Sequence, residues 1–207
     1  VERTVTSVHI PSDDMKGRLI GRQGRNIQAL EAALGIDIII DDTPETIILS
    51  GYNPVRREVG RRAIEQLLKD GRVHPARIEE CVNKATADVE SSLKEFGEKA
   101  ALEIGATGLH PEVVRLMGSL RYRTSYTQNQ WEHALEVGFL VGEMAAELKL
   151  NVRDAKRAGW LHDIGKAVSH EVEGGHAVIG ADILKKYGEK DHIIHAVRAH
   201  HDDVKPE

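Results

Sequence analysis

Two adjacent residues in the second half of the chain, His162 and Asp163, have the types required to hold a metal ion. They lie in an apolar stretch at 160–166, where a buried polar pair costs free energy unless a strong partner satisfies it. One imidazole nitrogen and one carboxylate oxygen suit manganese, iron, zinc or magnesium in a hydrolytic site. The pair therefore predicts a divalent-metal centre for hydrolysis.

His133 is a further candidate ligand, because it lies on a segment with the spacing of an amphipathic helix. Three apolar residues are expected to share its face and to turn it toward the core: Val137, Leu140 and Met144. Taken alone, His133 could equally be an ordinary core histidine. The histidines that we expect to be merely solvated, because their neighbours are polar, include His170, His192 and His195.

A second group with chemical potential forms a basic, glycine-bracketed loop near the start of the chain. The loop itself consists of Gly21, Arg22, Gln23 and Gly24. Residues 15–30 contain no acid, and their basic side chains are Lys16, Arg18, Arg22 and Arg25. Two glycines let the backbone approach phosphates closely, and the amides that open the next helix would face such anions. The pattern predicts a phosphate-gripping loop, with a plain turn between helices as the alternative.

The elements that position the loop follow from local patterns. Strands are expected where β-branched residues crowd together, at 4–10, 36–40 and 46–49. Helices are expected after the N-cap residue Ser12, at 25–34 and at 54–69. The predicted order up to residue 71 is β-α-α-β-β-α.

The rest of the chain has the three- to four-residue apolar spacing of helices. These are expected at 74–100, 111–120, 130–150, 153–161, 176–187 and 191–200, with a polar stretch at 121–129. The apolar stripe from 78 to 100 requires a partner, either the following helical bundle or a second subunit. The fold class predicted is thus an α+β unit with a three-stranded sheet, followed by an all-α unit.

Composition limits the remaining possibilities. With 207 residues, 41% of them hydrophobic, the chain is long enough to bury a core. A net charge of −5 excludes a protein that coats nucleic acid through bulk charge, so any such binding must be local. The single cysteine fits a reducing compartment, and no apolar run is long enough to cross a bilayer. A start at Val1 suggests a segment of a longer polypeptide.

The loop at 21–24 in its β-α-α-β-β-α setting resembles a KH domain, over residues 4–71. The resemblance implies that the loop, with Arg25, Lys16 and Arg18 nearby, clamps the backbone of about four unpaired nucleotides of RNA. The bases would lie in a groove beside the following helix and strand. Residues that would line this groove, or would be plain core, are Ile27, Leu30, Ile38 and Ile40.

The order His133, His162-Asp163, His176 and His200-His201 resembles the HD superfamily of metal-dependent phosphohydrolases. The resemblance implies that the metal ligands are His133, His162 and Asp163, whose bound water attacks a phosphate ester. Further ligands of a second metal, or groups that hydrogen-bond substrate, would be His176, His200 and His201. Lys166 would lie near the departing phosphate.

One expected ligand has no counterpart. The superfamily places a closing aspartate well downstream of the paired histidines, and Asp202 and Asp203 follow too closely. The helical domain is therefore expected to be incomplete at its C-terminus, and this chain by itself to be a weak or inactive nuclease.

The KH-then-HD order, together with 103–126, resembles the bacterial ribonuclease Y family along essentially the whole chain. The domains implied are a KH domain at 1–71, a connecting helix at 72–107 and the N-terminal part of an HD domain at 108–207. The family's activity is endonucleolytic initiation of messenger-RNA decay on single-stranded RNA. Its resemblance further implies a homodimer, RNA-degradation partners and a membrane anchor upstream, which would keep the parent protein on the cytoplasmic side.

Two other functions fit the same residues. The chain could be an RNA-binding module whose HD part is only a scaffold. It could also be an HD phosphohydrolase of nucleotides or cyclic dinucleotides, which the KH pattern disfavours.

Overall fold

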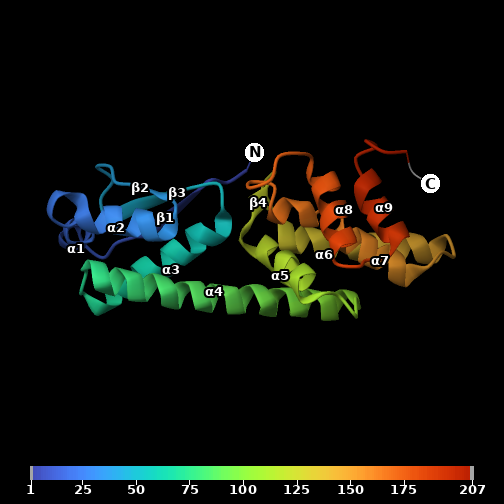
Figure 1. The fold of residues 1–207 in the computed structure, drawn as a ribbon, viewed down its shortest axis with the longest axis horizontal. Coiled ribbons are helices and arrows are strands. Elements are labelled where there is room, and N and C mark those ends of the chain that lie inside the picture. The colour runs from blue at the N-terminus through green and yellow to red at the C-terminus, as the bar shows by residue number, and fades with distance from the viewer. Residues whose placement is uncertain (1, 206–207) are drawn as a thin grey trace. The chain divides into compact units, whose positions relative to one another are not determined.

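A computed structural model describes residues 2–205, which divide into two compact units. One unit comprises residues 3–91, and the other comprises residues 92–205 together with Glu2. Each unit is described by itself below, and Figure 1 gives the labels of the elements.

The first unit has the order predicted from its sequence, β-α-α-β-β-α. Its elements are β1 (Val5–His9), α1 (Asp13–Ile20), a short 3-10 turn (Arg22–Gly24), α2 (Arg25–Leu34), β2 (Asp37–Ile39), β3 (Thr46–Ser50) and α3 (Pro54–Asp70). The sheet is antiparallel in the order β1-β3-β2, so β3 is its central strand. Helices α2 and α3 contact each other and pack against the sheet (Figure 1).

Local signals explain where these helices begin and end. The Ser12 side chain accepts a hydrogen bond from the amide of Met15 at the start of α1, and the Asn53 side chain caps α3 in the same way. Gly35 ends α2 and Gly71 ends α3, both in the left-handed conformation. The expected ends at 34 and 69 therefore agree with the structure to within one residue.

The segment expected to connect the two domains is one continuous helix, α4 (Pro75–Ile104), of 30 residues. Its first half belongs to the unit of residues 3–91 and its second half to the helical unit. Side chains of the predicted apolar stripe are buried along it, among them Ile78, Val82, Val89 and Leu93. The stripe is thus core within each unit.

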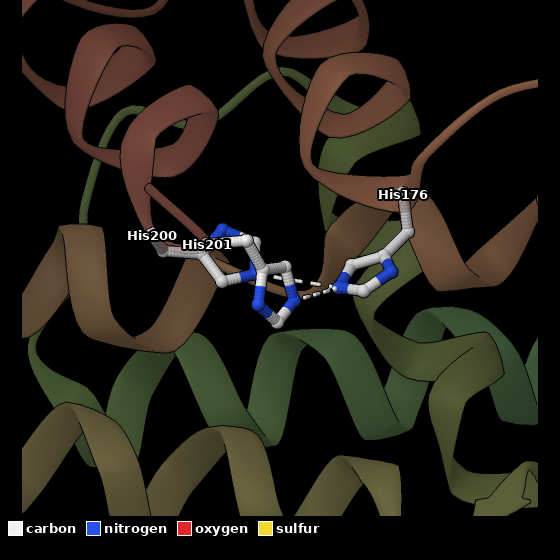
Figure 2. Close-up of side chains that lie close together, drawn as sticks. All are labelled: His176, His200 and His201. Carbon is white, nitrogen blue, oxygen red and sulfur yellow. Dashed lines mark hydrogen bonds between the residues drawn. The ribbon is translucent and has the colours of Figure 1, made fainter. Parts of the chain in front are cut away.

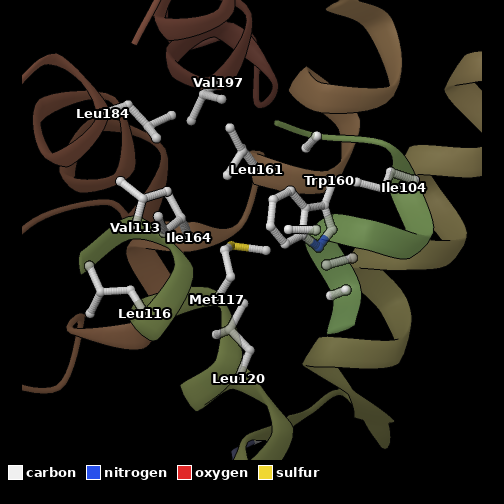
Figure 3. Close-up of a cluster of buried hydrophobic side chains, with 14 of the residues drawn as sticks. Ile104, Val113, Leu116, Met117, Leu120, Trp160, Leu161, Ile164, Leu184 and Val197 are labelled. Carbon is white, nitrogen blue, oxygen red and sulfur yellow. The ribbon is translucent and has the colours of Figure 1, made fainter. Parts of the chain in front are cut away.

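The second unit is built from helices around one apolar core. They are the second half of α4, α5 (Pro111–Ser119), α6 (Gln130–Glu147), α7 (Val152–Leu161), α8 (His176–Lys186) and α9 (Asp191–Ala199), with 3-10 turns at Leu120–Tyr122 and Ile164–Ala167. Trp160, Leu161 and Ile164 are completely buried in this core with Met117 (Figure 3). These residues flank His162 and Asp163, and burying each contributes about 2 kcal/mol, so the core fixes the pair in place.

One feature of this unit was not expected, and one expectation is wrong. The polar stretch at 121–129 contains a small antiparallel hairpin, β4 (Thr124–Ser125) and β5 (Gln128–Asn129), because Tyr126 and Thr127 adopt positive φ and close a tight turn. Helix α6 also buries a different face from the one expected: Leu140 and Met144 are 58% and 63% exposed.

The buried face of α6 is formed mainly by small residues that let α7 approach closely. They are Ala134, Gly138, Gly142 and Ala145. Small side chains carry little hydropathy, so the larger exposed residues dominated the sequence pattern. Within residues 2–205, no helix has both the length and the apolar character needed to cross a bilayer.

Candidate metal centre and nucleic-acid loop

The carboxylate of Asp163 lies between two groups of histidines in the helical unit. Asp163 is only 2% exposed and follows the C-terminal end of α7. Its Oδ2 lies 3.1 Å from His162 Nε2 and 3.7 Å from His133 Nε2. Its Oδ1 lies 3.1 Å from His176 Nε2 and 3.8 Å from His200 Nε2. One buried anion therefore faces the ligand atoms of four histidines.

Two sets of three residues have ligand atoms close enough together for one metal ion. The first is His133, His162 and Asp163, and the second is His176, His200 and His201; within each set the ligand atoms lie within 4.8 Å of one another. We call them triad A and triad B. All the residues expected to bind or surround a metal are thus brought together, from α6, α7, α8 and the C-terminal end of α9.

Triad B has a donor arrangement that suits a cation. Figure 2 shows the imidazoles of His200 and His201 pointing toward His176. The Nε2 atom of His176 lies 3.3 Å from that of His200 and 3.0 Å from that of His201. Between neutral rings, each short contact requires a proton on one of the two nitrogens. A metal ion would instead accept the lone pairs of all three.

The protonation of two ligands is fixed by the backbone. His162 Nδ1 lies 2.7 Å from the carbonyl oxygen of Gly159, and His200 Nδ1 lies 2.6 Å from that of Val197. A carbonyl only accepts hydrogen bonds, so in each neutral ring Nδ1 carries the proton and Nε2 presents its lone pair. This is the tautomer that a metal needs, and the hydrogen bonds to the two carbonyl groups also fix the orientation of the rings.

The charges in the site favour the ligating forms. Burial alone would raise the pKa of Asp163, but its contacts with His162, His176 and Lys166 hold it well below the usual range. Burial lowers the pKa of His133, with a further contribution from His162. Burial also lowers the pKa of His200. These shifts favour an ionised carboxylate at Asp163 and neutral imidazoles at His133 and His200.

Lys166 lies beside the same carboxylate, and a buried polar network holds it there. Its Nζ donates to Asp163 Oδ2 at 2.7 Å and to Gln130 Oε1 at 3.0 Å. Gln130 is buried, and its amide nitrogen faces the carbonyl oxygens of Ser125 and Gln128 at 3.4 Å. The hairpin therefore supports the lysine through one glutamine side chain.

A second support reaches Lys166 through its backbone. The buried guanidinium of Arg123 contacts the carbonyl oxygen of Lys166 and the carboxylate of Glu2. Sequence reasoning missed both residues, because Arg123 lies in the polar stretch at 121–129 and Gln130 is a polar residue at the start of the helix expected at 130–150. The only signal available was a polar run immediately before the helix that carries His133.

We expect Gly165→Ala to disturb triad B from a distance. A β-carbon at Gly165 would lie 2.0 Å from the carbonyl oxygen of His176, so the first turn of α8 would have to move. The expected loss is about 3 kcal/mol of unfolding free energy, together with weaker Mn²⁺ binding. Denaturant unfolding and metal titration measure the two effects.

Gly175→Ala is the matched control for this change. Gly175 directly precedes His176, but a β-carbon there has no neighbour within 4 Å and the residue has an ordinary φ of −71°. This variant should retain both stability and metal affinity. Equal behaviour of the two variants would show that the close approach at Gly165 does not position His176.

Two histidines expected to be solvated are half-buried and have buried ring nitrogens, which corrects that expectation. Both ring nitrogens of His170 and the Nε2 of His195 are shielded from solvent, and His170 Nε2 lies 3.4 Å from Glu171 Oε1. Burial lowers the pKa of His170. The polar neighbours of these residues in sequence gave no sign that the chain folds back over them. His192 is exposed as expected, with Nε2 3.0 Å from Asp154 Oδ2.

In the other unit, the glycine-bracketed loop has the backbone conformation of a tight, open turn. Gly21 and Gly24 have φ of 72° and 75°, and Gln23 between them has φ of 55°. Arg22, Gln23 and Arg25 are exposed, and Gly24 leads directly into α2. The amide of Gly24 donates to the carbonyl oxygen of Gly21 at 3.1 Å, and that of Arg25 donates to the carbonyl oxygen of Arg22. The two exposed arginines beside the N-terminal end of α2, rather than these two amides, therefore form the surface suited to phosphate groups.

The remaining residues assigned to this surface have other roles in the structure. Lys16 is buried, and its Nζ donates to the carbonyl oxygens of Asp41 and Thr43 at 2.8 Å, which ties α1 to the loop between β2 and β3. Arg18 is exposed and pairs with Asp14 at 3.0 Å. Of the four groove candidates, Ile27, Leu30 and Ile38 are core, and Ile40 is half-buried.

Comparisons with known proteins match both units. The KH domain family model matches residues 5–66, and the HD domain model matches residues 131–207. Ribonuclease Y of Pelobacter propionicus and that of Geotalea uraniireducens are each 65% identical over 99% of this chain. Ribonuclease Y of Syntrophobacter fumaroxidans is 59% identical over the whole chain.

The chain spans about two fifths of the length of these relatives, 39% of the first two and 40% of the third. No solved structure matches it. The fold expected from the sequence, a KH domain followed by a helical HD domain, is confirmed. Because both domains occur in one chain that aligns with these proteins along nearly its full length, the chain belongs to the ribonuclease Y family.

Proposed function

We propose that this chain supplies the RNA-binding and catalytic parts of a metal-dependent endoribonuclease that initiates messenger-RNA decay. The observation that carries the proposal is the buried carboxylate of Asp163. One of its oxygens faces His133 and His162 of triad A, and the other faces His176 and His200 of triad B. A site of this kind, in one chain with a KH domain, joins phosphodiester chemistry to RNA binding.

The residues that would hold a metal are those of triad A, with triad B as the second position. A divalent cation bound there supplies an activated water and neutralises charge on the phosphate. Five histidines and a single carboxylate form a nitrogen-rich donor set. Such a set favours manganese, iron or zinc over magnesium, which prefers oxygen ligands.

The protein groups around these ligands have separate tasks. The carbonyl groups of Gly159 and Val197 hold two imidazoles in the ligating tautomer. Lys166 brings a positive charge to the edge of the site, where it would bind the phosphate and stabilise charge on the departing oxygen. Gln130 keeps that charge from turning toward solvent.

The KH loop would hold the RNA strand through its phosphates. Exposed Arg22 and Arg25, beside the N-terminal end of α2, would provide contacts that do not depend on base identity. This grip suits single-stranded RNA, because unpaired nucleotides leave the backbone accessible along one groove. Binding and hydrolysis would then depend on different residues, which can be altered separately.

Removal of the metal is the direct test. A labelled single-stranded RNA is incubated with this chain and, side by side, with the whole protein, first with Mn²⁺ and then with a chelator. We expect cleavage to stop with the chelator and to return when Mn²⁺, Fe²⁺ or Zn²⁺ is restored, with Mg²⁺ less effective. Cleavage that persists in the chelator would refute the proposal.

The same assay separates the alternatives. Hydrolysis of nucleotides or cyclic dinucleotides in preference to RNA would favour a small-molecule phosphohydrolase. RNA binding without metal-dependent cleavage in the whole protein would favour a binding module. The homodimer, the RNA-degradation partners and the membrane attachment of the parent protein on the cytoplasmic side stay predictions.

A further inference from the structure

The linker between α3 and α4 is joined to the KH loop by one buried side chain. Asn26, in the first turn of α2, is 4% exposed. Its Nδ2 donates to the carbonyl oxygen of Arg18, just before the loop, at 2.9 Å, and to that of Val73, in the linker, at 3.3 Å. A β-carbon on Gly21 would lie 2.7 Å from the same nitrogen. The linker is therefore a direct neighbour of the loop.

The residues on either side of Val73 are exposed and carry polar groups that can donate hydrogen bonds. Arg72 and His74 are both exposed. The nearest acid in sequence, Asp70, is engaged by Arg77, whose Nε lies 2.9 Å from Asp70 Oδ2. The pKa of Asp70 is lowered mainly by its hydrogen bond with Arg77, and Arg72 adds only a weaker electrostatic contribution. Within residues 2–205, Arg72 forms no ion pair at contact distance, so its guanidinium donors are available to a ligand.

The orientation of His74 also suits an anion. Its Nδ1 accepts the backbone amide of Arg77 at 3.3 Å. The proton of the neutral ring is therefore on Nε2, which is the atom left to donate. Together, Arg72 and His74 place a charged donor and a neutral donor beside the end of the loop, at a position that the KH pattern of residues 5–66 does not include.

We propose that Arg72, with His74, forms a second phosphate contact of the RNA site, next to the phosphates held by the KH loop. The inference rests on the proposed binding of single-stranded RNA. Its ligand is a neighbouring phosphodiester of the same strand. Asn26 acts as the positioning residue, because it fixes the distance between the loop and the linker.

The test uses the salt dependence of binding, which reports phosphate contacts directly. Affinity of a labelled single-stranded RNA is measured for the parent chain and for Arg72→Gln at several salt concentrations. The slope of log affinity against log salt is negative, and loss of one phosphate contact to a single strand makes it less steep by about 0.7. We expect this change in Arg72→Gln, with affinity about threefold to tenfold weaker at low salt.

Arg56→Gln is the matched control. Arg56 is an exposed arginine of the same unit, but its guanidinium lies beside Gly35, at the opposite end of α2 from the loop. Its removal subtracts the same charge and should leave the slope unchanged. A parental slope in Arg72→Gln, or equal slope losses in both variants, would overturn the inference.

The outcomes distinguish this inference from the proposed function. If the parent chain does not bind single-stranded RNA, both fail. If the parent binds and Gly24→Asp abolishes binding, while Arg72→Gln retains the parental affinity and slope, RNA binding by the KH loop stands and the linker contact alone is refuted.

Discussion

Asp163→Asn should abolish metal binding and RNA hydrolysis together. The substitution keeps the shape of the side chain but removes the negative charge that faces the histidines of both triads. Substitution of residues that merely hydrogen-bond to metal ligands lowers metal affinity or activity by about 10- to 100-fold. Loss of a ligand itself should therefore lower the cleavage rate by more than about a hundredfold. Mn²⁺ content and the rate of RNA cleavage, both measured in the whole protein, test this expectation.

Asp154→Asn provides the matched control, because Asp154 also contacts a histidine but belongs to neither triad. Its Oδ2 lies 3.0 Å from His192 Nε2. This variant should retain metal and activity. Lys166→Ala should lower turnover less than Asp163→Asn and keep the metal, since Lys166 contributes charge without ligating. Metal-dependent cleavage that survives in Asp163→Asn would place the catalytic centre elsewhere.

Gly24→Asp should remove most of the affinity for single-stranded RNA and leave metal binding intact. A β-carbon at Gly24 would come no closer than 4.0 Å to a neighbouring atom, so the position has room for a side chain. Asp also tolerates the left-handed conformation that Gly24 adopts. The added carboxylate would repel the phosphate, and we expect affinity to fall at least tenfold, or about 1.4 kcal/mol. Fluorescence anisotropy with a labelled RNA measures this loss.

Gly24→Asn separates charge from shape. Asn has the same size as Asp and the same tolerance of positive φ, but it carries no charge. It should therefore bind RNA more tightly than Gly24→Asp, with a deficit that does not depend on salt. If the two variants bind equally well at low salt, the loop does not face a phosphate. Gly21 is less suitable for this test, because a side chain there would collide with Asn26.

The order of elements in the KH unit was predictable because its boundaries have local causes. Ser12 and Asn53 cap helices with their own side chains, and Gly35 ends one through a left-handed residue. The face of α6 was not predictable in this way. Its apolar pattern pointed to Leu140 and Met144, whereas packing against α7 selected the small residues Gly138 and Gly142.

The candidate metal ligands could be named from their order in the sequence, but not the groups that position them. The two triads, the shared carboxylate and the backbone partners of His162 are properties of three-dimensional geometry. Gln130 has no distinguishing sequence signal, since its role depends on where Lys166 lies after folding. Conversely, Lys16 looked like an RNA contact by charge alone, and only the fold reveals that two carbonyl groups occupy it.

Because the ligands come from four helices, metal binding and folding of the helical unit are thermodynamically coupled. Residues from 133 to 201 must all be in place before either triad exists, so an unfolded chain offers no comparable site. Free metal at about a hundred times its dissociation constant would add about 2.7 kcal/mol to the stability of that unit. The KH unit contributes no ligand to either triad. Metal supply would thus set the resistance of the helical unit to unfolding and proteolysis.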